Sequence, residues 1–163
     1  MNSFKIHKRA WLAGLIIPLL LAGIAGATEI YISPLKGTPG QTIVIPIMID
    51  QVKRLAGIKL ILTYDESVLH FKEGIKSPQT SELMHIINDR QPGRLVLVMA
   101  GAKGINGKDF PIITLRFEIK KKITAQQIVR LHIPEVQLMG DDLKDIQATV
   151  RIGELLIGNG RVK

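Results

Sequence analysis

Residues 93–104, with the sequence GRLVLVMAGAKG, are the most informative stretch for the fold of this chain. A strand with one face in water alternates apolar and polar side chains. Here both alternating sets are apolar, with Leu95, Leu97 and Met99 on one side and Val96, Val98 and Ala100 on the other. The strand is therefore either buried on both faces or has one face kept dry for a partner.

Short runs of strand-forming residues recur along the rest of the chain, separated by turn residues. Residues 57–64 and 112–119 alternate most clearly between apolar and polar side chains. About nine such runs with frequent turns, and no long stripe with helical spacing, predict an all-β fold built as a two-sheet β-sandwich or a jelly roll. Residues 74–82, the longest stretch without a strand pattern, are expected to form a surface loop.

The N-terminus has the three regions of a secretory signal peptide. Lys5, Lys8 and Arg9 form the positive region, residues 10–21 are apolar, and the small residues 25–27 precede a cleavage site before Thr28. The alternative is an uncleaved membrane anchor, although the apolar stretch is short for a spanning helix and contains helix breakers. We predict a signal peptide over residues 1–27, one domain over residues 28–158 and a polar tail over residues 159–163. The protein is then secreted, to the periplasm or outside the cell.

Composition excludes several classes of protein. The chain has no cysteine, so a disulfide framework and a lipid-modified cysteine are both ruled out. Three of the 22 Lys and Arg lie in residues 1–27, which leaves 19 basic against 14 acidic residues in the mature chain. Residues 120–122 are its only basic run, whereas a nucleic-acid-binding protein shows a denser basic stripe. We therefore expect no nucleic-acid partner and a stability that comes from an ordinary apolar core.

The mature chain offers no constellation for catalysis, so we do not expect an enzyme. His70, His85 and His132 lie in separate strand segments without metal-ligand spacing. The acids at positions 141, 142 and 145 lack the order of a calcium loop and are interpreted as a solvated turn. Neither a cofactor nor a bound metal is expected.

Four segments of the chain resemble the motifs of cohesin domains, in the order in which that family carries them. They are residues 38–46 (TPGQTIVIP), 62–71 (LTYDESVLHF), 92–104 (PGRLVLVMAGAKG) and 135–143 (EVQLMGDDL). The resemblance extends over about residues 29–158. It implies a nine-stranded jelly-roll sandwich that binds a dockerin, a small helical module that carries its own calcium and is often attached to polysaccharide-degrading enzymes.

The resemblance also implies where the partner binds. In the family, one sheet face made chiefly from the third, fifth, sixth and eighth strands contacts the dockerin. Projected by alternation onto this sequence, that face consists of Lys59, Ile61, Thr63, His85, Ile87, Val96, Val98, Ala100, Arg130 and His132, with Lys103 at the rim. A shift of one residue in register would turn a strand's candidates toward the core.

Two positions depart from the cellulosomal type I pattern. An aspartate that binds the dockerin corresponds here to Lys59, and an acidic residue near the end of the sixth strand corresponds to Gly101. A partner of this chain is therefore expected to present different polar groups, such as an acid that faces Lys59.

Two other functions remain open from the sequence. A carbohydrate-binding module has a similar fold, although such modules commonly stack sugars on aromatic side chains, and the only Trp is Trp11 in the predicted signal. An adhesion or envelope-assembly subunit that pairs through a sheet edge would leave no side-chain motif.

Overall fold

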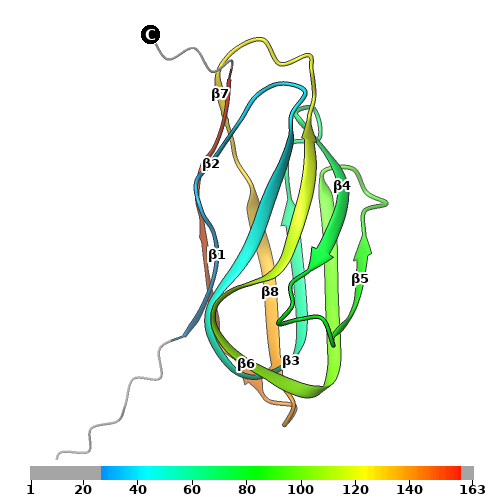
Figure 1. Cartoon of the computed structure of the whole chain (residues 1–163), viewed down its shortest axis with the longest axis vertical. Helices are drawn as coiled ribbons and strands as arrows, with labels where there is room; N and C mark the ends of the chain where they lie inside the picture. The colour runs from blue at the N-terminus through cyan, green and yellow to red at the C-terminus, as the bar shows by residue number, and fades with distance from the viewer. Residues whose placement is uncertain (1–26, 159–163) are drawn as a thin grey trace, which may run out of the picture.

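The computed structural model describes residues 27–158. Within that range the chain is entirely strands and turns (Figure 1). The predicted tail and all of the predicted signal peptide except Ala27 lie outside the described residues, so these two domain boundaries stay predictions. The strands are β1 (Thr28–Ile32), β2 (Leu35–Gly37), β3 (Thr42–Thr63), β4 (Leu69–Lys76), β5 (Met84–Asn88), β6 (Arg94–Ile119), β7 (Gln127–Val129), β8 (His132–Gly140), β9 (Asp145–Ile146), β10 (Ala148–Ile152) and β11 (Leu155–Ile157).

Two long strands, β3 and β6, run through both layers of the sandwich. The first half of β3 pairs with β1 and its second half with β8. In the same way, the first half of β6 pairs with β5 and its second half with β4. The register between β3 and β6 shifts around Leu55, where both strands bend at the lower end of the molecule in Figure 1. One layer is therefore ordered β8-β3-β6-β5, and the opposite layer is ordered β10-β1-β3-β6-β4.

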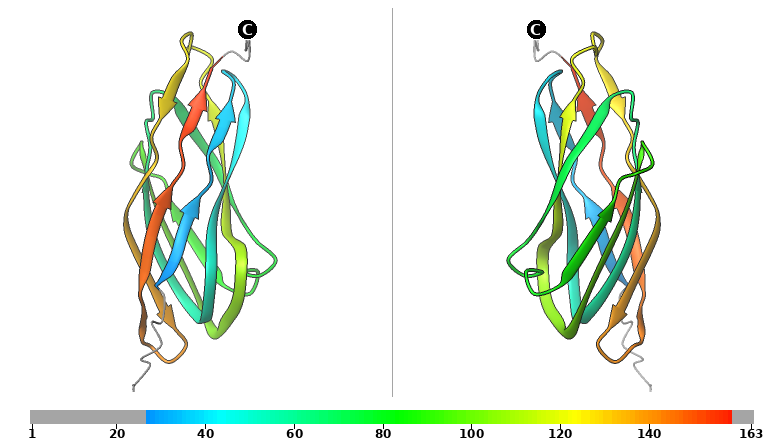
Figure 2. Two further views of the ribbon diagram at one scale, coloured as in Figure 1. Left: turned by 90° about the vertical axis from the view of Figure 1, so that its left-hand side faces the viewer. Right: turned by 90° about the vertical axis from the view of Figure 1, so that its right-hand side faces the viewer.

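The nine runs expected from the sequence are divided differently in the structure. The two bends leave β3 and β6 as continuous strands, whereas the first and last runs are each interrupted. Pro34 has no N–H to donate, and at that level the pairing passes from β1 and β10 to β2 and β11. The short sheet β2-β11-β7 completes one end of the sandwich (Figure 2). The prediction of an all-β sandwich with two sheets is confirmed, and the jelly-roll topology stays a prediction.

The core lies between the layers and is almost wholly aliphatic. Leu95, Leu97 and Met99 are only 2%, 2% and 1% exposed, so the predicted inward set of β6 is confirmed. Phe117 is the largest fully buried side chain, and the rings of Tyr64 and Phe71 meet it edge to face at centroid distances of 4.9 and 5.5 Å. Such aromatic pairs stabilise a core beyond the area they bury.

The connection from β4 to β5 is more ordered than the expected surface loop. Its first residues extend β4 to Lys76, and its turn carries two buried polar side chains, Ser77 and Thr80. The Thr80 hydroxyl donates to the carbonyl oxygen of Ile112 at 2.8 Å, which ties the turn to β6. Leu83, at the end of the turn, is buried in the core cluster. The turn therefore holds β5 at the edge of its layer.

Candidate binding face

The outward side of the layer β8-β3-β6-β5 is the candidate binding face, which we call the outer face. Cross-strand register aligns its side chains in rows that run across the four strands. The three central rows are Met139, Gly57, Ala100 and Met84; Gln137, Lys59, Val98 and Ile86; and Glu135, Ile61, Val96 and Asn88.

Exposed apolar side chains gather on this face. Met84, Ile86, Val98 and Met139 are 77%, 71%, 41% and 41% exposed, and they occupy two adjacent rows. Side chains of this size are normally buried, and a contiguous exposed cluster marks an interaction surface. We call these four residues the apolar cluster.

Several residues predicted for the site lie on the outer face in the structure. Lys59, Val96, Val98 and Ala100 belong to its central rows, and Thr63 lies in the next row, opposite Arg94 and His132. The doubly apolar strand is therefore explained by one side in the core and one side on this face.

Ile61 also points outward but is only 7% exposed. It does not belong to the core cluster that contains its neighbours Leu60 and Leu62. Ile61 therefore lies on the predicted side of β3, but little of its side chain is accessible there.

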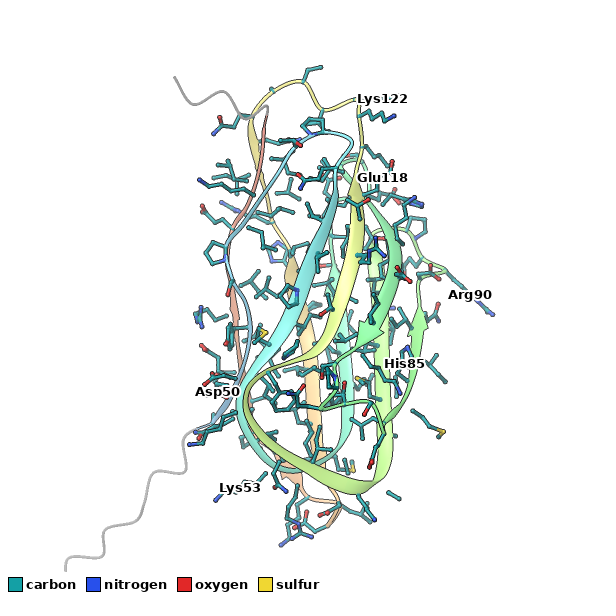
Figure 3. All side chains as sticks on the ribbon, in the orientation of Figure 1. Asp50, Lys53, His85, Arg90, Glu118 and Lys122 are labelled. Atoms are coloured by element: carbon teal, nitrogen blue, oxygen red, sulfur yellow. The ribbon has the colours of Figure 1, made fainter. Side chains whose placement is uncertain are left out.

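The predicted register of β5 is wrong by one residue. Ile86 pairs with exposed Val98, whereas Ile87 pairs with buried Leu97 and packs against the core. His85 pairs with buried Met99 and shares the parity of Ile87, although it is exposed because β5 is an edge strand (Figure 3). The face therefore receives Met84 and Ile86 in place of His85 and Ile87. Apolar residues occupy both parities of this strand, so alternation did not identify its outward side.

Arg130 is not part of the outer face. It lies between β7 and β8, where the chain passes from one sheet to the other, and it lines a pocket of about 730 Å³ with Val150, Ile152 and Glu154. The contribution of β8 to the central rows comes instead from Glu135, Gln137 and Met139. Lys103 is exposed beyond Ala100, in the irregular stretch where β3 and β6 change register.

The positive charge of Lys59 is paired with an acidic side chain of the same protein. Its Nζ lies 2.5 Å from Oε1 of Glu135, and both side chains are partly exposed. Sequence reasoning missed Glu135 because the ion pair depends on the pairing of β3 with β8, 76 positions apart in the sequence. The only signal was its place in a segment that resembles the family.

Gly101 occupies the other position at which the family pattern carries an acid. A Cβ atom there would lie 2.5 Å from Cδ2 of Leu83, which is buried in the core. Any larger residue would have to displace the side chain of Leu83, so the packing disfavours a side chain at this position.

The end of the sandwich next to the outer face is held together by Arg54. This residue has a φ of 59° at the bend of β3, and its backbone N–H donates to Oδ1 of Asn106 at 2.9 Å. Its Nε donates to Oδ1 of Asp141 at 2.6 Å, while Oδ2 of Asp141 accepts from the N–H of Gly104 at 3.1 Å. One arginine therefore fixes β3, β6 and the turn after β8 relative to one another.

Two of the three acids that were weighed as a calcium site, Asp141 and Asp142, have partners in this turn. Asp142 accepts from the backbone N–H of Lys144, and this hydrogen bond, together with Arg54 and Lys144, lowers the pKa of the Asp142 carboxyl. Among the described residues, no three His, Cys, Asp or Glu side chains come together as metal ligands do. Over the same residues, no helix is long and apolar enough to cross a membrane.

The fold and the outer face define a β-sandwich module with an exposed aliphatic sheet face. A family model, Cohesin domain, matches residues 28–155, and the chain belongs to this family. No curated protein matches the sequence.

Solved structures share the fold at low sequence identity. A non-cellulosomal cohesin from the hyperthermophilic archaeon Archaeoglobus fulgidus is 17% identical with a TM-score of 0.70, over 82% of this chain and 93% of that chain. The sixth cohesin of scaffoldin B from Acetivibrio cellulolyticus, solved in complex with a Cel5 dockerin mutant, is 18% identical with a TM-score of 0.71, over 82% and 99%. A type I cohesin–dockerin complex from Clostridium thermocellum, Coh-OlpC-Doc435, gives 18% and 0.71, over 81% and 94%.

Proposed function

We propose that this chain is a non-catalytic binding module that holds a dockerin on its outer face. Membership of the cohesin family supports the class of function, and several structures with the same fold are cohesins in complex with dockerins. The observation that carries the proposal is the apolar cluster of Met84, Ile86, Val98 and Met139 on one sheet face. Calcium would be carried by the dockerin.

The apolar cluster suits a protein partner better than a sugar. The aromatic side chains of the described residues lie elsewhere: Tyr64, Phe71 and Phe117 pack together, Phe110 is buried, and Tyr31 lies under the guanidinium of Arg151. The outer face therefore has no flat ring on which a pyranose could stack. Aliphatic side chains that protrude from a sheet instead fit the apolar side of a helix.

Binding energy is expected to concentrate at the centre of the outer face. Val98 lies between Lys59 and Ile86 in the middle of a row and is flanked by Val96 and Ala100 along its own strand. Central, well-packed apolar residues usually carry most of an interface's affinity, whereas contacts at the rim exclude water. We propose that the dockerin is attached to a polysaccharide-degrading enzyme. Mass spectrometry of the proteins that this domain captures would identify that enzyme.

Titration calorimetry with a calcium-loaded dockerin module encoded in the same genome tests the proposal. Wild-type protein is expected to bind it, and removal of calcium with EDTA is expected to abolish binding. Val98→Asp should weaken binding by about 100-fold or more, because it removes the central apolar contact and adds a second carboxylate beside Lys59, whose charge Glu135 already matches. Val44→Asp is the matched control, since Val44 is 50% exposed on the opposite layer. Equal affinity of the Val98→Asp and wild-type proteins would reject the outer face as the binding site.

We further propose that the protein is exported by residues 1–27 and acts in the periplasm or outside the cell. The basic, apolar and small-residue regions of that segment support export. N-terminal sequencing of the exported protein should begin at Thr28. A chain that keeps its first 27 residues at the membrane would instead support the anchor alternative.

A further inference from the structure

The ion pair between Lys59 and Glu135 lies at the centre of the outer face, next to the apolar cluster. Register places Lys59 opposite Gln137 and Ile61 opposite Glu135, so the ion pair runs diagonally from β3 to β8. The side chains of Lys59 and Glu135 are 43% and 35% exposed. A partner that covers the apolar cluster must therefore also cover or displace this pair.

The pair also accounts for the burial of Ile61. Along β3, Ile61 lies between the outward residues Lys59 and Thr63, and across the strands it lies between Glu135 and Val96. The methylene groups of a lysine commonly lie along an apolar surface while its charge reaches a polar partner. We attribute the 7% exposure of Ile61 to these flanking residues, since Lys59 and Glu135 reach toward each other beside it.

We propose that Lys59 and Glu135 form a self-contained neutral pair, so that a docked partner needs no charge opposite Lys59. This inference rests on the proposed function. Covering a single charge without a counter-charge is costly, whereas a pair that keeps its own hydrogen-bonded partner is buried at lower cost. An acid from the partner would bring a second negative charge beside Glu135. The fitting partner therefore presents uncharged side chains at the centre of the face.

The remaining charges on this side suggest where the partner's acidic groups lie. Arg94 is on the outer face opposite Thr63, and Lys103 lies beyond the other end of the β6 segment that contains Val98. In the part of the chain that the structure describes, neither forms an ion pair. We therefore expect the acidic groups of the partner to lie opposite Arg94 and Lys103 at the ends of the face, and not opposite Lys59 at its centre.

A charge swap tests the inference against the same calcium-loaded dockerin. Lys59→Glu and Glu135→Lys each place two like charges side by side at the interface and should each weaken binding about tenfold or more. The double variant Lys59→Glu/Glu135→Lys restores a pair of opposite charges. It should bind within about threefold of wild type, because the partner does not distinguish which of the two strands carries the positive charge. Thermal unfolding of each variant controls for folding. The uncharged pair Lys59→Met/Glu135→Gln replaces the single reversals if they do not fold, and it should also retain binding.

Two results would overturn the inference while leaving the proposed function intact. If the double variant binds as weakly as the single reversals, the partner recognises one of the two charges directly. If the single reversals bind like wild type, the partner tolerates two like charges at this place, and the neutrality of the pair has no part in docking. Failure of the wild-type protein to bind the dockerin is a different result, because it removes the proposed function and this inference with it.

Discussion

The two layers of the sandwich present very different surfaces, although β3 and β6 supply strands to both. On the opposite layer, the outward residues of β6 are Thr114, Arg116 and Glu118, and two of them form ion pairs with β4: Glu118 with Lys72 at 2.6 Å and Arg116 with Glu73 at 2.7 Å. Lys72 also lowers the pKa of the Glu118 carboxyl. On the outer face, the outward residues of the same strand are Val96, Val98 and Ala100.

This difference indicates that the outward side of β6 is apolar only in its first half, where the strand belongs to the outer face. The second half of β6 alternates as a strand with one wet face should, with Ile113, Leu115 and Phe117 buried. Val44 and Ile75 are exposed on the opposite layer as well, but Arg116 and Thr114 of β6 stand between them. Isolated exposed aliphatic residues are ordinary, whereas a contiguous cluster is not.

The largest expected effect is a loss of stability at β5, where a residue packed against the core is next to an exposed one. Ile87→Ser should lower the free energy of unfolding by about 2 kcal/mol, because Ile87 packs against the core and serine would replace apolar contacts with a hydroxyl. Urea denaturation measures this change. An unaltered unfolding midpoint would mean that Ile87 faces the solvent and that the register of β5 is the one predicted from the sequence.

A smaller effect, on binding alone, is expected at the neighbouring residue. Ile86→Ser should change stability by no more than about 0.5 kcal/mol, since this side chain is 71% exposed. It should weaken dockerin binding by about tenfold through the loss of an apolar contact at the side of the cluster. If Ile86→Ser instead lowers stability as much as Ile87→Ser, the contrast between the two positions is lost.

Alternation predicted most of the fold, because it depends on residues close together in the sequence. The inward set of Leu95, Leu97 and Met99 and the outward positions on β3 and β6 follow from period-2 spacing. The cohesin family was also recognised correctly from four short segments. Where one of the two alternating sets of side chains in a strand was clearly polar or clearly part of the core, the sequence alone identified the inward side of the strand.

The remaining site positions depend on contacts that spacing does not encode. Met84, Ile86 and Ile87 put apolar groups on both parities of β5, so only its pairing with β6 selects the outward set. Arg130 was predicted to lie on the binding face, whereas the chain leaves one sheet and joins another at that point. The partner of Lys59 is fixed by the pairing of β3 with β8, and the same pairing places Glu135 opposite Ile61.

Chemical-shift mapping of the isotope-labelled domain during titration with the calcium-loaded dockerin tests the central claim most directly. The amides of Met84, Ile86, Val98 and Met139 are expected to shift or broaden as the partner covers the apolar cluster, while those of Val44 and Glu118 on the opposite layer stay in place. Shifts that gather on the opposite layer and leave the apolar cluster unchanged would contradict the assignment of the outer face as the docking surface.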